Sequence, residues 1–174
     1  MKILLSIFCL LILVSCSPTP EIQSDQLVER QGITYEVNSQ TPFTGISVEY
    51  YLDTIIKNEF EERVLKTRII FKDGIREGLY ESFHLNGQLE MRGNFIDGKE
   101  DGLKESYYDE GQLEVRGNFI DGKMVGLFEV YYDNGQLSRT GNFIDGKEDG
   151  LWETFDEGGN LTETKEYLYG ELIE

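Results

Sequence analysis

Apolar and polar residues alternate along most of the chain, in short runs separated by pairs of turn-forming residues. The runs are rich in Leu, Phe, Tyr, Val and Thr, and none shows the 3.6-residue period of an amphipathic helix. Asp-Gly pairs, which favour the two-residue turns of antiparallel hairpins, stand at residues 73–74, 97–98, 121–122 and 145–146. A second set of turn signals stands at residues 86–87, 110–111, 134–135 and 158–159. The pattern predicts strands joined by tight turns.

The pattern repeats every 24 residues, with units that begin at Phe71, Phe95, Phe119 and Phe143 and a half-unit that begins at Tyr167. A fixed period is typical of proteins in which each unit packs only on its neighbours. We therefore predict an all-β fold: an elongated, coiled antiparallel meander of 24-residue β-hairpin repeats. The phrase GNFIDGKEDGL occurs at residues 93–103 and again at 141–151, and we interpret it as scaffold, because the hairpin itself recurs.

Two-residue turns at both signals would fix the register of each hairpin. Glu81 then lies opposite Arg92, and Glu105 lies opposite Arg116. In the same register aromatic rings cover strand glycines, with Tyr80 opposite Gly93 and Phe128 opposite Gly141, whereas Lys104 opposite Gly117 does not follow this pattern.

The register divides the sheet into two faces. The more apolar face, which we expect to be concave and buried, carries Tyr80, Leu89, Met91, Phe95, Leu113, Val115, Phe119, Phe128, Leu137, Phe143, Trp152 and Leu161. The other, solvated face mixes Leu79, Leu103 and Leu127 with Glu81, Glu105, Arg92, Arg116, Phe83, Tyr107, Tyr131 and Phe155.

A degenerate unit precedes the regular ones. Residues 45–51 align with residues 102–108, a second strand follows from Leu65 to Ile70, and about nine residues are inserted around 53–63. An enlarged hairpin tip could bind a partner through residues such as Asp53, Lys57 and Glu61. The alternative is a surface insertion that the fold tolerates.

The N-terminus reads MKILLSIFCLLILVSC, a signal-peptide layout whose apolar run is shorter than the roughly 20 residues of a membrane span. Its last four residues resemble the lipobox of bacterial lipoproteins, in which Cys16 would carry a lipid. The alternatives are an ordinary secretory leader and an uncleaved anchor. We therefore divide the chain into a signal peptide (1–15), a lipidated cysteine with a polar tether (16–31), a degenerate repeat with its insertion (32–70), and four repeats plus a half-repeat (71–174).

Charge and composition exclude several function classes. The formal net charge is −17 and no basic stretch interrupts it, so nucleic acid is not an expected partner and anionic headgroups would be repelled.

His84 is the only histidine, and removing the leader would leave no free thiol, so we expect no catalytic residues and no cofactor. Gly98-Lys99 lacks the rest of a phosphate loop. We expect no metal either, although calcium at the acidic turns stays open as an alternative.

The phrase D-G-K-x-x-G-L-x-E-x-Y-Y-x-x-G-Q-L at residues 97–113 and 121–137 resembles the variant MORN repeat of the YwqK-type antitoxin proteins. Pro42-Phe43-Thr44-Gly45 resembles the opening of those proteins, and the likeness covers about residues 32–170. The resemblance implies a β-hairpin repeat fold and a non-enzymatic protein that acts as the antitoxin of a toxin pair.

Two hypotheses of function follow. In the first, a membrane-anchored lipoprotein of the cell envelope binds, and as an antitoxin inhibits, a protein partner. In the second, a structural envelope lipoprotein contacts glycans through the aromatic stripe that contains Tyr107 and Tyr131. Ser17 is not the aspartate that retains some lipoproteins in the inner membrane, which favours the outer membrane.

Overall fold

A single long β-sheet forms the body of the protein. The computed structural model describes residues 19–51, 55–57 and 60–173. Within these ranges the only helical segment is the short 3-10 turn η1 (Ser24–Gln26). The N-terminal strands are β1 (Glu21–Gln23), β2 (Leu27–Arg30), β3 (Ile33–Glu36), β4 (Gly45–Tyr50), β5 (Ile55–Lys57) and β6 (Phe60–Glu62).

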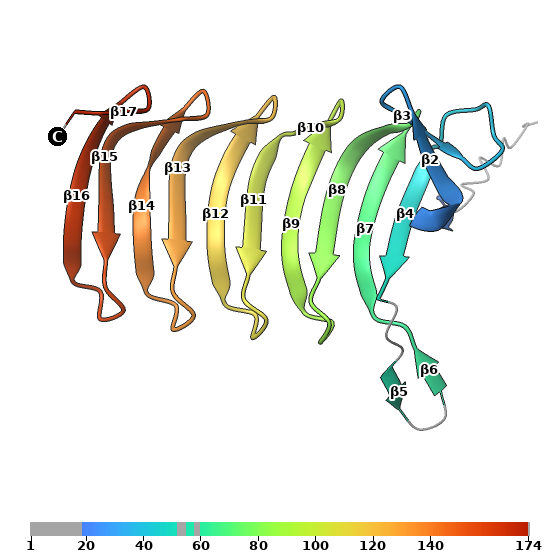
Figure 1. Cartoon of the computed structure of the whole chain (residues 1–174), viewed down its shortest axis with the longest axis horizontal. Helices are drawn as coiled ribbons and strands as arrows, with labels where there is room; N and C mark the ends of the chain where they lie inside the picture. The colour runs from blue at the N-terminus through green and yellow to red at the C-terminus, as the bar shows by residue number, and fades with distance from the viewer. Residues whose placement is uncertain (1–18, 52–54, 58–59, 174) are drawn as a thin grey trace, which may run out of the picture.

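The repeat region supplies the remaining strands. They are β7 (Leu65–Lys72), β8 (Ile75–Phe83), β9 (Leu89–Ile96), β10 (Lys99–Glu100), β11 (Gly102–Tyr107), β12 (Leu113–Ile120), β13 (Lys123–Tyr131), β14 (Leu137–Ile144), β15 (Lys147–Phe155), β16 (Leu161–Leu168) and β17 (Glu171–Leu172). The order in the sheet is β1-β4-β7-β8-β9-β11-β12-β13-β14-β15-β16-β17, with β10 beside β9 (Figure 1). The predicted all-β meander of successive hairpins is confirmed, and the sheet does not close.

The Asp-Gly turns have two residues, as predicted. Each aspartate lies in the left-handed region, with φ between 50° and 54°, and its glycine follows at 79° to 80°. Asp97 and Gly98, for example, connect Ile96 of β9 to its direct partner Lys99. Asparagine, aspartate and glycine tolerate this backbone better than other residues, so the local sequence alone specifies the turn.

The second turns are longer than the predicted two residues. Phe83 pairs with Leu89, so residues 84–88 form the connection, and a bulge follows Ser82. The amide of Gly87 donates to the carbonyl of His84, and the amide of His84 donates to the carbonyl of Gln88, both at 2.8 Å. The bulge compensates for the longer connection, because beyond it Ser82 pairs with Met91, as a two-residue turn would require. The predicted register beyond the turn is therefore confirmed.

Neighbouring Asp-Gly turns are hydrogen-bonded to one another. The amide of Gly122 donates to the carbonyl of Glu100 at 2.8 Å, and equivalent bonds join the other units. Lys99 Nζ donates to the Asp121 carboxylate at 2.9 Å, and the amide of Asp121 donates to the Asp101 carboxylate at 3.3 Å. The lysine and the second aspartate of GNFIDGKEDGL thus hold the next turn, which supports the interpretation of the phrase as scaffold.

The opposite row of turns is joined by side chains. The hydroxyls of Tyr51, Tyr108 and Tyr132 each donate to a carbonyl of the following unit, at 2.7 to 2.8 Å. His84 occupies the equivalent position, with Nε2 2.8 Å from the carbonyl oxygen of Tyr107. The histidine therefore has a structural contact at the place where other units use tyrosine.

The N-terminal region departs from the predicted tether. β1 pairs in parallel with β4, β2 forms a hairpin with β3, and η1 joins β1 to β2, so residues 21–30 are part of the folded structure. The segment predicted as a tether, residues 16–31, therefore contains β1, η1 and β2 in its described part. Where the degenerate unit is predicted, β4 pairs with β7, and the separate hairpin β5–β6 stands between them in the chain and extends beyond the sheet (Figure 1).

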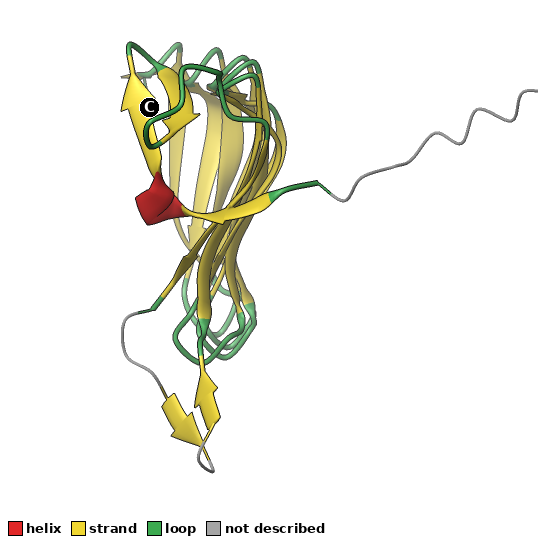
Figure 2. Cartoon of the chain, turned by 90° about the vertical axis from the view of Figure 1, so that its right-hand side faces the viewer, coloured by secondary structure: helices red, strands yellow, loops and turns green. Residues whose placement is uncertain are grey.

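The sheet is strongly curved along its strands, and η1 with the hairpin β2–β3 lies on its hollow side at the N-terminal end (Figure 2). Phe43 packs on Phe71 there, with ring centroids 5.9 Å apart. The predicted apolar face is the concave one, but it is not buried. Among the described residues only Phe43, Val48, Phe71 and Trp152 are buried apolar side chains, because no second layer covers β8 to β16.

Candidate functional site

The open concave face is the best candidate for a binding surface. Its middle contains an apolar hollow of about 220 Å³, which β9, β11, β12 and β13 line with Met91, Lys104, Ser106, Val115, Gly117, Phe119, Met124 and Phe128. Phe119 comes from the start of a repeat, and the other side chains follow the two-residue period of each strand. The aliphatic stem of Lys104 completes the surface, while its ammonium group bonds Glu100 at 2.6 Å.

An aromatic cluster lies beside this hollow. Trp152, which is only 2% exposed, packs on Phe143 with ring centroids 5.2 Å apart and on Phe128 at 5.9 Å. The strand glycine Gly141 makes room for it, since a Cβ there would lie 2.1 Å from the indole ring. At Gly93, Gly117 and Gly141 the closest side chains, those of Lys104, Phe128 and Trp152, come from the following strand, while the predicted residues of the preceding strand lie opposite the glycines in the backbone register.

The C-terminal end of the concave face is charged. A hollow of about 250 Å³ is lined by Arg139, Trp152, Thr154, Glu163 and Lys165. Arg139 lies over the Trp152 ring at 4.4 Å and bonds Glu148 at 2.8 Å, while Lys165 bonds Glu163 at 2.9 Å.

These charged residues break the repeat, and the sequence interpretation did not single them out. Arg139 stands where other units have Met91 and Val115, and Lys165 replaces the strand glycine seen at Gly93 and Gly117. Comparison of equivalent positions across the four units could have found them.

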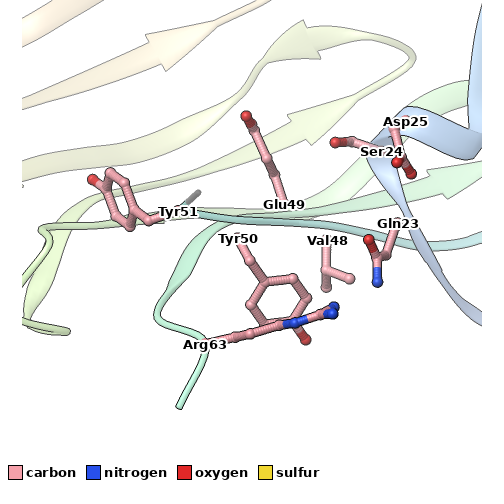
Figure 3. Close-up of a pocket in the computed structure, with 8 residues that line it drawn as sticks. All are labelled: Gln23, Ser24, Asp25, Val48, Glu49, Tyr50, Tyr51 and Arg63. Atoms are coloured by element: carbon pink, nitrogen blue, oxygen red, sulfur yellow. The ribbon is translucent and has the colours of Figure 1, made fainter. Parts of the chain in front are cut away.

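A third hollow, of about 400 Å³, lies at the N-terminal end, where β1 and η1 meet β4 (Figure 3). Glu49, Ser24 and Asp25 lie on one side of β4, and Val48, Tyr50 and Arg63 lie on the other (Figure 3). Because its lining is divided between the two sides of a strand, this hollow does not form one continuous binding surface.

The predicted aromatic site residues, Tyr107 and Tyr131, lie on the convex face and are half-buried. The guanidinium carbon of Arg92 lies 6.0 Å from the Tyr107 ring centroid, and that of Arg116 lies 5.9 Å from the Tyr131 ring centroid. Burial, followed by the hydrogen bond to Glu105, raises the pKa of Tyr107. Both rings therefore pack against the charged row beside them.

That row is a ladder of alternating charge. Arg68, Glu81, Arg92, Glu105, Arg116 and Glu129 lie opposite one another on successive strands. The predicted opposition of Glu81 and Arg92 is confirmed, yet Arg92 forms its ion pair with Glu105 of the next unit, at 2.6 Å. Arg116 likewise pairs with Glu129. The ion pairs therefore join different repeats.

The other predicted site residues are not brought together with these tyrosines. Lys57 is the last residue of β5, and Glu61 is the central residue of β6, in a hairpin separate from the main sheet. Asp53 lies outside the described residues, as do Cys16 and the predicted signal peptide.

The described residues hold no cluster of metal-ligating side chains. No group of three or more His, Cys, Asp or Glu side chains there could hold a metal ion. The same residues include no helix long and apolar enough to cross a membrane. The turn aspartates Asp121 and Asp145 accept hydrogen bonds from Lys99 and Lys123 of the preceding unit.

The sequence profile described as the MORN repeat variant matches residues 76–97, 100–121, 124–145 and 148–169. Together these segments span half of the chain. No curated protein matches the chain. A crystal structure of a mutant TarM from S. aureus, in complex with fondaparinux, α-GlcNAc-glycerol and UDP, aligns with 15% identity and a TM-score of 0.33, over 72% of this chain and 21% of the TarM chain. At this distance the likeness says nothing about the fold or the function of this chain.

Proposed function

Because the chain belongs to the MORN repeat variant family and its concave face is open, we propose that it is a non-enzymatic protein-interaction module whose concave face binds a protein partner. The observation that carries the proposal is the uncovered apolar hollow formed by β9 to β13. Apolar surface of this kind is stabilised by removal from water, and in the regular units nothing described removes it.

Substitutions within the hollow test the proposal. Val115→Asp places a carboxylate among apolar side chains, where a bound partner could not solvate it. We expect the full chain, used as bait in its own cell extract, to retain one stoichiometric protein partner, and the Val115→Asp variant to lose it. Leu85→Asp, at a turn residue that is 48% exposed, is the matched control and should keep the partner.

Retention of the partner by both variants would place the interaction elsewhere on the molecule. Circular dichroism of the Val115→Asp variant must first show an intact sheet, since a half-buried strand position is changed. If instead glycans are retained and no protein is, the second hypothesis, a structural or glycan-contacting role, replaces the first.

The likeness to YwqK-type antitoxins extends the proposal to an immunity role, in which the partner is a toxin. Co-expression with the product of the adjacent gene tests this extension. Growth rescued by the chain and lost with the Val115→Asp variant would support it, and rescue by neither would remove it.

Anchoring at a membrane through a lipid on Cys16 belongs to the same proposal. The lipobox-like Leu13-Val14-Ser15-Cys16 motivates it. Cys16→Ala should move the protein from the membrane fraction to the soluble fraction. A variant that stays with the membrane would contradict lipid anchoring, whichever partner the concave face binds.

A further inference from the structure

One departure from the repeat lies inside the apolar hollow of the concave face. The third unit reads GNFIDGKMVGL at residues 117–127, whereas the copies at 93–103 and 141–151 read GNFIDGKEDGL. Met124, one of the two residues that change, lines the hollow. Because the other copies form the same hairpin with a charged residue at this position, neither the turn nor the strand requires a methionine.

The positions equivalent to Met124 carry charged side chains that contact their own neighbours. They are Arg76, whose guanidinium carbon lies 5.5 Å from the Phe95 ring centroid, Glu100, which bonds Lys104 at 2.6 Å, and Glu148, which bonds Arg139 at 2.8 Å. Around Met124 the places of Lys104 and Arg139 are taken by Phe128 and Val115. Three neighbouring positions have therefore exchanged charged residues for apolar ones together.

The second change in this copy removes a hydrogen bond from the scaffold. In the other units a carboxylate accepts the backbone amide of the residue 20 positions later, at 2.9 to 3.3 Å; the pairs are Glu77 with Asp97, Asp101 with Asp121, and Asp149 with Tyr169. Val125 stands at the equivalent position and has no carboxylate to offer the amide of Asp145. The third unit thus lacks a contact that the fold uses elsewhere, at the place where it gains apolar surface.

The hollow has the size and the charge of a site for one apolar side chain. At about 220 Å³ it is smaller than the roughly 300–1,000 Å³ of pockets that enclose a whole small molecule. The Phe128 ring and the Met124 sulfur cover Gly117, where a Cβ would lie 3.2 Å from the ring and 3.7 Å from the sulfur. Lys104 is the only charged side chain among the described residues that line the hollow, and its ammonium group already bonds Glu100. An uncharged group therefore fits without leaving a buried charge unpaired.

We propose that the hollow binds one bulky apolar side chain of the protein partner, aromatic or leucine, and that Met124 determines this specificity. Thioether side chains adapt to the shape of such a group, and Met91 supplies a second one from β9. A single anchor in a desolvated pocket carries much of the binding energy in many interfaces. The inference rests on the proposed function, since it names the part of the partner that the concave face recognises.

Methionine-methyl NMR of the full chain tests the site directly. The chain has three methionines, of which Met91 and Met124 line the hollow and Met1 serves as the reference signal. The probe is N-acetyl-tryptophanamide, and N-acetyl-lysinamide is its charged control. We expect the tryptophan amide to shift the Met91 and Met124 methyl signals and the lysine amide to shift neither. Absence of any shift up to the solubility limit of the tryptophan amide would overturn the proposal.

Returning the third copy to the phrase of its neighbours, one residue at a time, tests the role of Met124. Met124→Glu should weaken binding of both the probe and the partner by roughly tenfold or more, because the bound side chain would desolvate the new carboxylate. Val125→Asp is the matched control, since Val125 pairs with Asn118 and lies on the other face of the strand. This variant should keep both ligands, and its thermal midpoint should not fall, because the new carboxylate can accept the Asp145 amide.

The outcomes separate this inference from the proposed function. If Val115→Asp releases the partner and Met124→Glu does not, the concave face still binds the partner and the specificity assigned to Met124 is wrong. If neither variant releases it, both proposals fail. Methyl signals that shift with protein concentration alone would assign the hollow to a second copy of the chain. Shifts produced by phosphatidylcholine vesicles instead of the tryptophan amide would assign it to acyl chains, and either result would overturn the inference.

Discussion

The two faces of the sheet are stabilised in different ways. On the concave face, aromatic rings from successive strands contact one another, as Phe128, Phe143 and Trp152 do. On the convex face, ion pairs such as Arg92 with Glu105 connect the strands, and the aliphatic side chains beside them stay exposed. Trp152, in the middle of these rings, is 2% exposed, whereas Leu151, the preceding residue on the other face, is 55% exposed. The concave face thus contributes more stability, and the convex face leaves more apolar surface free.

The largest expected effect comes from comparing substitutions at two adjacent residues that lie on opposite faces. Trp152→Ala removes the most buried ring and should lower the free energy of unfolding of the C-terminal units by about 3–5 kcal/mol. Leu151→Ala, one residue away and 55% exposed, should change it by less than about 0.5 kcal/mol. Urea unfolding followed by circular dichroism measures both. Equal effects would mean that the two faces contribute alike.

A smaller effect is expected where two strand glycines differ in their surroundings. Gly141→Ala would place a Cβ 2.1 Å from the Trp152 ring, and the overpacking should cost about 1–3 kcal/mol. Gly93→Ala would place its Cβ 3.6 Å from the Lys104 stem, an ordinary contact, and should cost less than about 0.5 kcal/mol. The same denaturation experiment compares them. If Gly93→Ala were the more destabilising, backbone conformation rather than ring packing would explain these glycines.

The convex ladder gives a third comparison. Glu105→Ala leaves both Arg92 and the Tyr107 hydroxyl without their acceptor and should cost about 1 kcal/mol, since Arg92 is half exposed and water can replace the pair. Glu163→Ala breaks an exposed pair with Lys165 on the concave face and should cost no more than about 0.5 kcal/mol. Midpoints of thermal unfolding suffice for the comparison. A larger effect at Glu163 would assign the charged end of the concave face a structural role that its exposure does not suggest.

The smallest expected effect is the change in the stability contributed by Asp121 at acidic pH. The hydrogen bond from Lys99, and then its charge, hold the pKa of Asp121 below the ordinary value of 3.8. A carboxyl group whose pKa is lower in the folded state stabilises the fold above its unfolded pKa, and that stability is lost as the pH falls through the folded value. Asp121→Asn should therefore be slightly less stable at pH 7 and converge with the parent as the pH falls through the folded-state pKa of Asp121. Thermal melts across this range test it, and a difference that does not vary with pH would contradict the assignment.

The regular units were predictable because their signals are local. Asp97-Gly98 specifies its turn through the backbone preferences of two adjacent residues, and the 24-residue period places every strand. The predicted two-residue turn at residues 86–87 is instead a five-residue connection, residues 84–88, because its backbone bonds join His84 to Gly87 and Gln88. β1 was missed because its three residues gain their strand conformation only by pairing with β4, more than twenty positions away.

The candidate site was predictable only in part. The apolar face follows from the alternation within each strand, whereas the tyrosines chosen as binding residues lie on the other face and pack against arginines. Their choice relied on residue type, and the sequence did not reveal that Arg92 and Arg116 would lie over their rings. Arg139 and Lys165 are visible only as exceptions to the repeat.

The identical segments at residues 93–103 and 141–151 begin 48 positions apart, which is two full units. A chain shortened by residues 93–140 would still read GNFIDGKEDGL at the join, with Arg92 before it and Trp152 after it. The turn-to-turn bonds would re-form across the join, because the same residue types donate and accept them. The length of the concave face can therefore change in whole steps through gain or loss of hairpins that keep the turn-to-turn bonds. A lineage of such proteins could match partners of different length by altering only the number of its units.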